Sequence, residues 1–391
     1  MKHKLSVGLV GLGYRGAYLL KMLQAMPELV ELVGIADPAL QGRQHYEGIQ
    51  VYAEGARSHE ALIEATKPEL LIIASPWHYH IPQALYALSH GCHVALEIKP
   101  GISTEGQESE YAPIYEAIKQ SGRRVFPLEN AVFFREVLAI WQMVELGVFG
   151  ELIHLRGGYR HDLRRILIDE VGRPRQSGEG SWRYAYYHGV NADIYPTHGF
   201  APIALMAGLG RRDRIQSLYT QGSRALGLID ALHPDEVQRG EAQGGFLSDI
   251  ITTHIRSERG ILLNLIHDTT LPRPRGLDWE VQGTRGIWEG DKRRIYLQGE
   301  SPQETWEDDS AYIERYEHPL WQAWGAKALE VDAHHQGMDY IMLRTLVADL
   351  AGEAKYPITL DDLVLWCSIT PLSAESIRRG EVLHFPTDKP L

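Results

Sequence analysis

Two short segments near the middle of the chain pair tyrosine with histidine, residue types that can move protons near neutral pH. Tyr159 and His161 lie two residues apart in a segment of alternating polarity, so a β-strand would place phenol and imidazole on one face. Tyr195 precedes His198, which is expected to open a helix capped by Thr197, where the helix dipole favours a neutral imidazole. These residues are candidate acids and bases, and His198 is the best candidate for a general base.

Each candidate also has an ordinary structural explanation. A tyrosine and a histidine can decorate a solvated sheet face, and a histidine at a helix start can simply be held by the helix end. Arg273 and Arg275, in the loop predicted over residues 272–276, could bind an acidic or polar substrate group, although a Pro/Arg loop is more often solvated. The functional interpretation requires that the fold bring these side chains together.

A glycine-rich turn near the N-terminus has the spacing of a dinucleotide-binding site. The pattern GxGxxG lies between a predicted strand, residues 5–10, and a predicted helix, residues 14–26. Glycines there let backbone N–H groups and the helix N-terminus approach a pyrophosphate. The candidate cofactor-binding residues of this turn are Gly11, Gly13, Tyr14, Arg15 and Gly16.

An acidic residue ends the second predicted strand, residues 29–36. Asp37 lies about 20 residues beyond Gly16, where a carboxylate can accept hydrogen bonds from both ribose hydroxyls and would repel a 2′-phosphate. The site therefore favours NAD over NADP. The plainer alternative is that the glycines allow a tight turn and that Asp37 caps one.

The elements around these residues predict two domains. Apolar runs over residues 70–74 and 93–97 alternate with helices, which indicates an α/β Rossmann domain with a doubly wound parallel sheet over residues 1–130. Ser75, Trp77 and His80 follow the first run and are expected at the carboxyl edge of that sheet, where they are candidate cofactor-binding residues. Trp77 could instead only cover the sheet edge.

The remaining residues, 131–391, predict an α+β domain for substrate binding and oligomerisation. Its sheet is expected to be open and mainly antiparallel, with helices beginning at Thr197 and spanning about residues 325–350. Alternating strand patterns cover residues 151–160, 248–257, 260–268, 278–288 and 293–298.

Composition excludes several classes of function. A net charge of −12 without a basic stripe argues against nucleic acid, and no apolar run is long enough for a membrane span. Cys92 and Cys367 lie far apart, and no motif of metal-binding spacing occurs, so neither a disulfide framework nor a metal is expected. The N-terminus lacks the pattern of a secretory signal, and a cytoplasmic location is expected.

Motifs spread along the chain carry a family resemblance. The Rossmann pattern, the sheet-forming half and the segment 91–97 between them resemble the Gfo/Idh/MocA oxidoreductase superfamily. Within it, the chain is most similar to glycoside hydrolase family 109, the NAD-dependent α-N-acetylgalactosaminidases. The motifs are PWHYH, LEN at 128–130, GGYRHDLR, YPTHG, HDTTLPRPR, VQGTRG, HQGMDY and the run 366–376.

The chain departs from related patterns at three places. Dehydrogenases of the superfamily have Glu-Lys-Pro where this chain has Glu97-Ile98-Lys99-Pro100, and a one-residue displacement on a strand would reverse the face of Lys99. They also tend to carry aspartate at the place of Ile194. The glycosidase family usually has Glu-Val-Pro at residues 97–99 and tyrosine at the place of Arg275.

The resemblance implies hydrolysis of a glycoside without net redox change. Transient oxidation of the sugar C3 hydroxyl by NAD acidifies the C2 proton and permits elimination at C1, after which water adds and C3 is reduced again. It further implies a homo-oligomer and roles for more residues. These are Glu97 and Glu129 at the ribose or nicotinamide, and Lys99, Asn130 and Asp339 at the sugar.

Two other functions fit the same sequence features. One is an NAD-dependent sugar or inositol dehydrogenase, in which Lys99 reaches the substrate and NADH accumulates with product. The other is an NAD-sensing or scaffold protein without catalysis. Turnover separates the three hypotheses.

Overall fold

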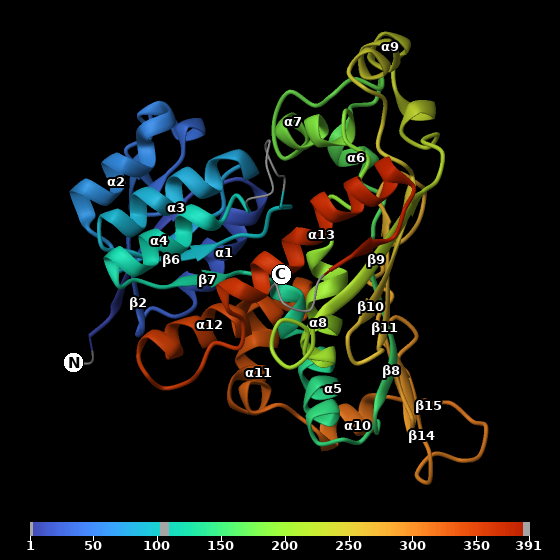
Figure 1. Ribbon diagram of the computed structural model, residues 1–391. Coiled ribbons are helices and arrows are strands. Elements are labelled where there is room, and N and C mark those ends of the chain that lie inside the picture. The colour runs from blue at the N-terminus through green and yellow to red at the C-terminus, as the bar shows by residue number, and fades with distance from the viewer. Residues whose placement is uncertain (1–2, 102–108, 386–391) are drawn as a thin grey trace. The chain divides into compact units, whose positions relative to one another are not determined.

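The computed structural model describes residues 3–101 and 109–385 (Figure 1). This chain divides into two compact units, of which the first holds residues 3–99, 109–130 and 323–363, and the second holds residues 100–101, 131–322 and 364–385. One division between the units falls after residue 130. Residues 323–363 differ from the expectation, because they belong to the first unit although they follow most of the second.

The first unit contains a sheet in which seven described strands run in the order β3-β4-β2-β1-β5-β6-β7. All neighbouring strands pair in parallel except β3 and β4. Apolar residues on both faces are buried, as a doubly wound sheet requires, which confirms the predicted fold class. The strands are β1 Leu5–Val10, β2 Val30–Ala36, β3 His45–Tyr46, β4 Ile49–Tyr52, β5 Leu70–Ile73, β6 His93–Leu96 and β7 Val125–Pro127.

The helices of the first unit pack in pairs, α1 with α12 and α3 with α4. A single helix over 325–350 was the wrong expectation, because the chain breaks between α11 and α12. Gly337 has a φ of 84°, a left-handed conformation that glycine adopts without steric cost. The helices are α1 Tyr14–Gln24, α2 Ser58–Thr66, α3 His80–Ser89, α4 Ala112–Ser121, α11 Pro319–Val331, which begins in the second unit, and α12 Met338–Leu350.

The second unit is built on a sheet of nine described strands in the order β15-β14-β13-β12-β8-β11-β10-β9-β16. Pairing is antiparallel except between β8 and β11, which confirms a mainly antiparallel sheet. The segment 278–288 was wrongly expected to be one strand, because a turn at Thr284 and Arg285 folds it into a hairpin. The strands are β8 Leu152–Arg160, β9 Ile215–Gly222, β10 Ile250–Ser257, β11 Leu262–Asp268, β12 Glu280–Gly283, β13 Gly286–Glu289, β14 Arg294–Leu297, β15 Glu307–Asp308 and β16 Leu383–His384.

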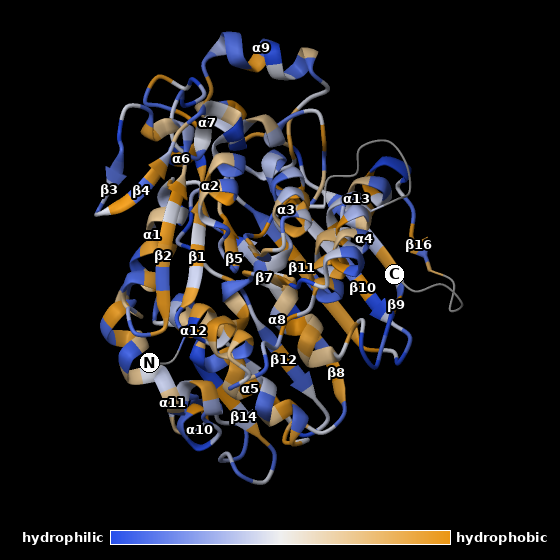
Figure 2. Cartoon of the chain, turned by 90° about the vertical axis from the view of Figure 1, so that its left-hand side faces the viewer, coloured by the Kyte–Doolittle hydropathy of each residue, from blue (hydrophilic) through white to orange (hydrophobic). Residues whose placement is uncertain are grey.

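One face of this sheet is covered by helices, with α8 lying on β8 and β11 and α5 packing against α8 (Figure 1). Helix α9, by contrast, is mostly hydrophilic (Figure 2). In the described part of the chain, no helix combines the length and hydrophobicity needed to cross a membrane. The helices are α5 Arg135–Glu145, α6 Arg164–Leu167, α7 Gly180–Arg183, α8 Thr197–Ala207, α9 Pro234–Ala242, α10 Ser310–Arg315 and α13 Leu360–Arg379, which begins in the first unit.

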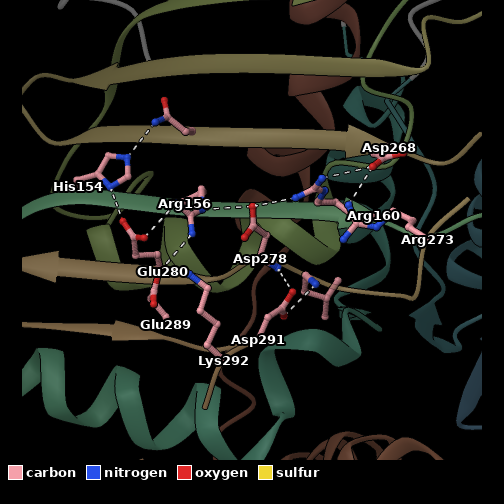
Figure 3. A network of polar contacts seen from close by, with 12 residues as sticks. His154, Arg156, Arg160, Asp268, Arg273, Asp278, Glu280, Glu289, Asp291 and Lys292 are labelled. Atoms are coloured by element: carbon pink, nitrogen blue, oxygen red, sulfur yellow. Dashed lines mark hydrogen bonds and ion pairs between the residues drawn. The ribbon is translucent and has the colours of Figure 1, made fainter. Parts of the chain in front are cut away.

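The opposite face of the sheet carries charged side chains that pair across strands (Figure 3). Arg156 of β8 lies 3.1 Å from Glu280 and 3.3 Å from Asp278, and His154 lies 3.0 Å from Glu280. Residues of β8 therefore alternate between this polar network and the helix-covered core, as the strand period of two requires.

Candidate functional site

The glycine-rich turn of the first unit leaves open the space that a pyrophosphate needs. A Cβ on Gly16 would lie 1.9 Å from the carbonyl oxygen of Gly11, and a Cβ on Gly11 would lie 2.7 Å from the backbone of Ala74. Gly13, the N-cap of α1, would meet nothing within 4 Å. The outer glycines are required for close packing and the middle one keeps the helix N-terminus accessible, so the turn fits a dinucleotide phosphate.

Asp37 ties the glycine turn to the end of β2. Its carboxylate accepts the backbone N–H of Leu12 at 2.5 Å and that of Ala39 at 2.8 Å, which caps a short helical turn. The capping role raised as the plainer alternative is therefore present. Each carboxylate oxygen has more than one lone pair, so the side chain retains acceptor capacity for ribose hydroxyls.

Arg15 and four polar partners form a group, here called the Arg15 cluster: Arg15, Glu97, Asn130, His335 and Asp339. The Arg15 guanidinium lies 2.6 Å from Glu97 and 2.6 Å from Asp339. Asn130 donates to Asp339 at 3.0 Å, and His335 Nδ1 lies 2.6 Å from the other carboxylate oxygen. Candidates expected at the cofactor or the sugar are thus bonded to one another, although nothing in sequence spacing places Asp339 beside Arg15.

Burial and charge shift the pKa values of the two carboxyl groups in opposite directions. Burial raises the pKa of Asp339, but the Arg15 charge and the hydrogen bonds from His335 and Arg15 outweigh it and hold that pKa well below its usual value. For Glu97 burial dominates and raises the pKa despite Arg15. When one partner of a salt bridge with a fully buried carboxylate is removed, the remaining charge is uncompensated and the fold is strongly destabilised.

Asp332, His335 and Asp339 also offer ligand atoms within 4.8 Å of one another. Two of them belong to the Arg15 cluster, and the backbone N–H of Asp339 donates to Asp332 at 3.0 Å. The guanidinium bonded to Asp339 would repel a divalent cation at this place. The contacts favour an ion-pair network there.

The segment after β5 holds its own polar groups. His80 Nε2 lies 2.7 Å from the Ser75 carbonyl oxygen, and the Ser75 hydroxyl donates to Gln83 at 2.6 Å. Burial lowers the pKa of His80 to about 4, so the ring is neutral. Trp77 is buried as well. These contacts fix the loop next to the glycine turn, and its role at the cofactor stays a prediction.

Lys99 and Glu129 are both buried. Lys99 pairs with Glu110, and its ammonium lies 5.7 Å from the centre of the Tyr111 ring. The one-residue displacement of Lys99 was expected to turn its side chain to the other face of a strand. That expectation was wrong, because β6 ends at Leu96 and Lys99 lies beyond it. Beyond a strand end, alternation does not determine direction.

The tyrosine and histidine candidates of the second unit meet in one group, here called the Tyr159 cluster: Tyr159, His161, Tyr195 and His198. Ring centres lie 4.7 Å apart for Tyr159 and Tyr195, and 4.9 Å apart for Tyr195 and His198. The Tyr159 ring lies 5.5 Å from that of His198 and 6.2 Å from that of His161. The fold therefore brings together the four residues expected to move protons, whose catalytic roles stay a prediction.

Glycines allow this meeting. A Cβ on Gly157 would lie 2.1 Å from the carbonyl oxygen of Gly199, and a Cβ on Gly199 would lie 2.4 Å from the backbone nitrogen of Gly158. The backbones of β8 and α8 thus touch directly, and the space beside Gly157 is filled by the helix. The expected Thr197 cap was wrong, because α8 begins at Thr197 and its N-cap is Pro196, without a side-chain hydrogen bond.

Two further polar side chains of this region were not selected from the sequence. Arg183 is buried, pairs with Glu179 and lies 5.0 Å from the centre of the Tyr195 ring, within the range of a cation–π interaction. Buried His267 is the partner of Tyr159 in the parallel β8–β11 register, so both side chains project from one face. The motif HDTTLPRPR was the available signal for His267.

His267 is unusual because neither ring nitrogen has a hydrogen-bond partner among the described residues. Burial, reinforced by the Arg183 charge, lowers its pKa to about 3, so the imidazole is neutral. Burial and the charges of Arg275 and Arg183 likewise lower the pKa of His161. Neutral imidazoles beside phenols can accept and donate protons, which charged ones cannot do equally.

Asp193 supports the backbone of Tyr195. Its carboxylate accepts the Tyr195 N–H at 3.1 Å, and its own N–H donates to the Ser373 hydroxyl at 2.9 Å. Burial raises the pKa of Asp193 to about 7. A group titrating near neutral pH thus lies two residues from the Tyr159 cluster's second tyrosine.

The two arginines of the predicted loop differ in their surroundings. Arg273 lies 2.9 Å from buried Asp268 and belongs to the polar network of Figure 3. Arg275 is exposed, and its charge acts on His161. Their shared expectation as substrate-binding residues stays a prediction.

Comparisons with known proteins agree with both units. Residues 5–127 match the model of the oxidoreductase family with an NAD-binding Rossmann fold, and residues 133–388 match the C-terminal domain of glycosyl hydrolase 109. A glycosyl hydrolase family 109 protein of Stenotrophomonas maltophilia is 33% identical, covering 98% of this chain and 88% of its own. An alpha-N-acetylgalactosaminidase of Tannerella forsythia is 34% identical over 86% of this chain and 74% of its own.

Solved structures show the same fold at low identity. The WlbA dehydrogenase of Bordetella pertussis, in complex with NADH and UDP-GlcNAcA, aligns with a TM-score of 0.70 at 17% identity over 99% of each chain. A levoglucosan dehydrogenase in complex with NADH and levoglucosan aligns at 0.69 and 18%, over 98% of this chain and 100% of that one. With a domain model matched over most of its length and relatives above 30% identity, the chain belongs to glycosyl hydrolase family 109, an enzyme family built on the NAD-binding oxidoreductase fold.

Proposed function

We propose that this chain is an NAD-dependent glycosidase that acts on a glycoside, with an α-N-acetylgalactosaminide as the first substrate to test. The observation that supports it most is the Tyr159 cluster, two phenols and two imidazoles with neighbouring ring centres 4.7–6.2 Å apart in a family 109 domain. An acetal that lacks a pair of catalytic carboxylates beside it needs such proton carriers if it is to be opened by elimination.

The glycine turn and Asp37 would hold the cofactor, and NAD is favoured over NADP because Asp37 would repel a 2′-phosphate. Bound NAD supplies reversible oxidation of a sugar hydroxyl, which the side chains of a protein cannot supply. The residues of the chain then have to move protons and position the sugar.

Three proton transfers are needed, and the Tyr159 cluster has groups for each. His198 is the proposed base for the sugar C3 hydroxyl, and Tyr195 lies beside it under the Arg183 charge. Tyr159 and His161 are the proposed pair for the C2 proton and the departing C1 oxygen, in which the neutral imidazole accepts a proton and the phenol donates one. Water addition and re-reduction at C3 restore the starting redox state, so the net reaction is hydrolysis.

The test is hydrolysis of aryl glycosides, including 4-nitrophenyl N-acetyl-α-galactosaminide, with and without added NAD, in D₂O. Release of nitrophenol that depends on bound NAD, with deuterium at C2 of the product, is the expected result. Product without label at C2 would refute the elimination. Stoichiometric NADH formed from free sugars would instead identify a dehydrogenase.

A further inference from the structure

Arg275 is held opposite His161 by the backbone. Arg160 and Gly276 form an antiparallel bridge, in which the Arg160 N–H donates to Gly276 at 3.1 Å and the Gly276 N–H donates back at 2.8 Å. His161 and Arg275 each lie one residue from this bridge, so the loop backbone runs beside the end of β8. The Arg275 charge lowers the pKa of His161 and therefore acts at the edge of the Tyr159 cluster.

The carboxylates around Arg275 are bonded to other groups. Asp162 holds Arg164 at 2.8 Å, and Glu179 holds Arg183. Asp268 lies 2.9 Å from Arg273. None of these three carboxylates is paired with Arg275.

Asp291, next to the loop, does not supply the missing partner either. Its carboxylate accepts the backbone N–H groups of Leu277 and Asp278 at 3.2 and 3.1 Å. Arg275 has no ion pair or hydrogen bond with any residue that the structure describes, and its side chain is exposed. An unmatched guanidinium beside groups that move protons is suited to an anionic group of a ligand.

We infer that Arg275 recognises an anionic substituent, a carboxylate or a sulfate, on the sugar ring of the substrate. The inference rests on the proposed function for the Tyr159 cluster as the place where the sugar reacts. A guanidinium presents paired N–H donors that match two oxygens of either anion, whereas a neutral sugar leaves this charge unused. Arg273 is excluded from the role because Asp268 and the Pro274 carbonyl hold it.

Substrate preference in matched variants tests the inference. The NAD-loaded enzyme is assayed with a neutral aryl N-acetyl-galactosaminide, its 6-sulfate and an aryl galacturonide. We expect kcat/KM for the better anionic substrate to fall roughly tenfold in Arg275→Gln, with partial recovery in Arg275→Lys, while the neutral substrate changes little. Arg273→Gln, the control in the same loop, should change all three by one common factor. Equal changes for neutral and anionic substrates in Arg275→Gln would overturn the inference.

Binding separates this inference from the proposed function. Calorimetry with galacturonate, galactose 6-sulfate and galactose needs no turnover, and Arg275→Gln should lose the preference for the anions. The four charged groups acting on His161 are Arg275, Arg183, Asp162 and Glu179, so an anion at Arg275 should raise the NMR-measured pKa of His161 while galactose does not. Anion preference without hydrolysis would defeat the proposed function alone, and hydrolysis without anion preference in either assay would defeat this inference alone.

Discussion

The Arg15 cluster and the Tyr159 cluster show opposite ways of arranging polar groups inside one chain. In the Arg15 cluster a cation is matched by two carboxylates, and Asp339 accepts bonds from three side chains. In the Tyr159 cluster, two phenol and two imidazole rings have neighbouring centres 4.7–6.2 Å apart, and His267 beside it has no hydrogen-bond partner among the described residues. The first arrangement is held together by ion pairs, and the second gathers residue types that can carry protons.

This contrast separates candidate residues that maintain the fold from those that can serve a ligand. A polar side chain whose charges and lone pairs are satisfied by the protein contributes mainly to structure. One that is neutral, buried and unpartnered carries a cost of desolvation that a bound substrate can relieve. Mutations should therefore separate the clusters, with stability lost in the first and activity lost in the second.

His198→Ala should have the largest effect, and it falls on activity. Removal of a general base typically costs about 10²- to 10⁴-fold in kcat, and urea unfolding should change by less than about 1 kcal/mol. Steady-state kinetics with the aryl glycoside and a urea titration measure both. His254→Ala, an exposed histidine on β10, is the matched control and should leave kcat unchanged. Full activity in His198→Ala would remove this residue from the mechanism.

Asp339→Ala should have the next largest effect, and it falls on stability. The change leaves the Arg15 guanidinium without one of its two carboxylates, which should lower the free energy of unfolding by about 3–5 kcal/mol. Urea denaturation measures the loss. Arg57→Ala breaks an exposed pair with Glu60 and should leave the free energy of unfolding nearly unchanged. Equal losses in the two variants would show that the Arg15 cluster is no more than a surface salt bridge.

His267→Leu should alter how stability depends on pH. The folded pKa of about 3 lies below the unfolded value of about 6.5, so His267 contributes stability above about pH 6.5 that is lost as pH falls toward 3. In wild type this effect makes the free energy of unfolding rise by about 1.4 kcal/mol per pH unit between pH 4 and 6.5, and the variant should lack this rise. Urea titrations across this range measure it, and parallel curves for the two proteins would contradict the burial of a neutral ring.

Asp193→Asn should change the pH dependence of stability in the opposite direction, over a slightly narrower pH range. The folded pKa of about 7 lies above the unfolded value of about 3.9, so Asp193 contributes stability below about pH 4 that is lost as pH rises through 7. Relative to wild type, the free energy of unfolding of Asp193→Asn should therefore rise by about 1.4 kcal/mol per pH unit between pH 4 and 7. Tyr195 keeps an acceptor for its N–H, so kcat should change little at pH 6. A curve that follows wild type would contradict a raised pKa.

Much of the fold follows from local sequence signals. The strand at residues 5–10, the glycine turn and Asp37 lie where spacing predicts them, because their interactions involve neighbours in sequence or adjacent strands. Errors arose where distant contacts prevail. Helical periodicity continues through residues 325–350, yet Gly337 breaks it where α12 packs on α1, and the turn at Thr284 reverses an alternating run into a hairpin.

Residue types and their spacing were enough to identify the glycine turn, the two kinds of domain and the four tyrosine and histidine candidates. The pairing of polar residues with one another became visible in the folded structure. Folding brings Asp339 to Arg15 across more than 300 positions and packs Gly199 against Gly157. It also pairs Arg273 with Asp268, whereas Arg275 stays exposed. The physical reason is that ion pairing and desolvation depend on distance in space, which spacing along a chain does not fix.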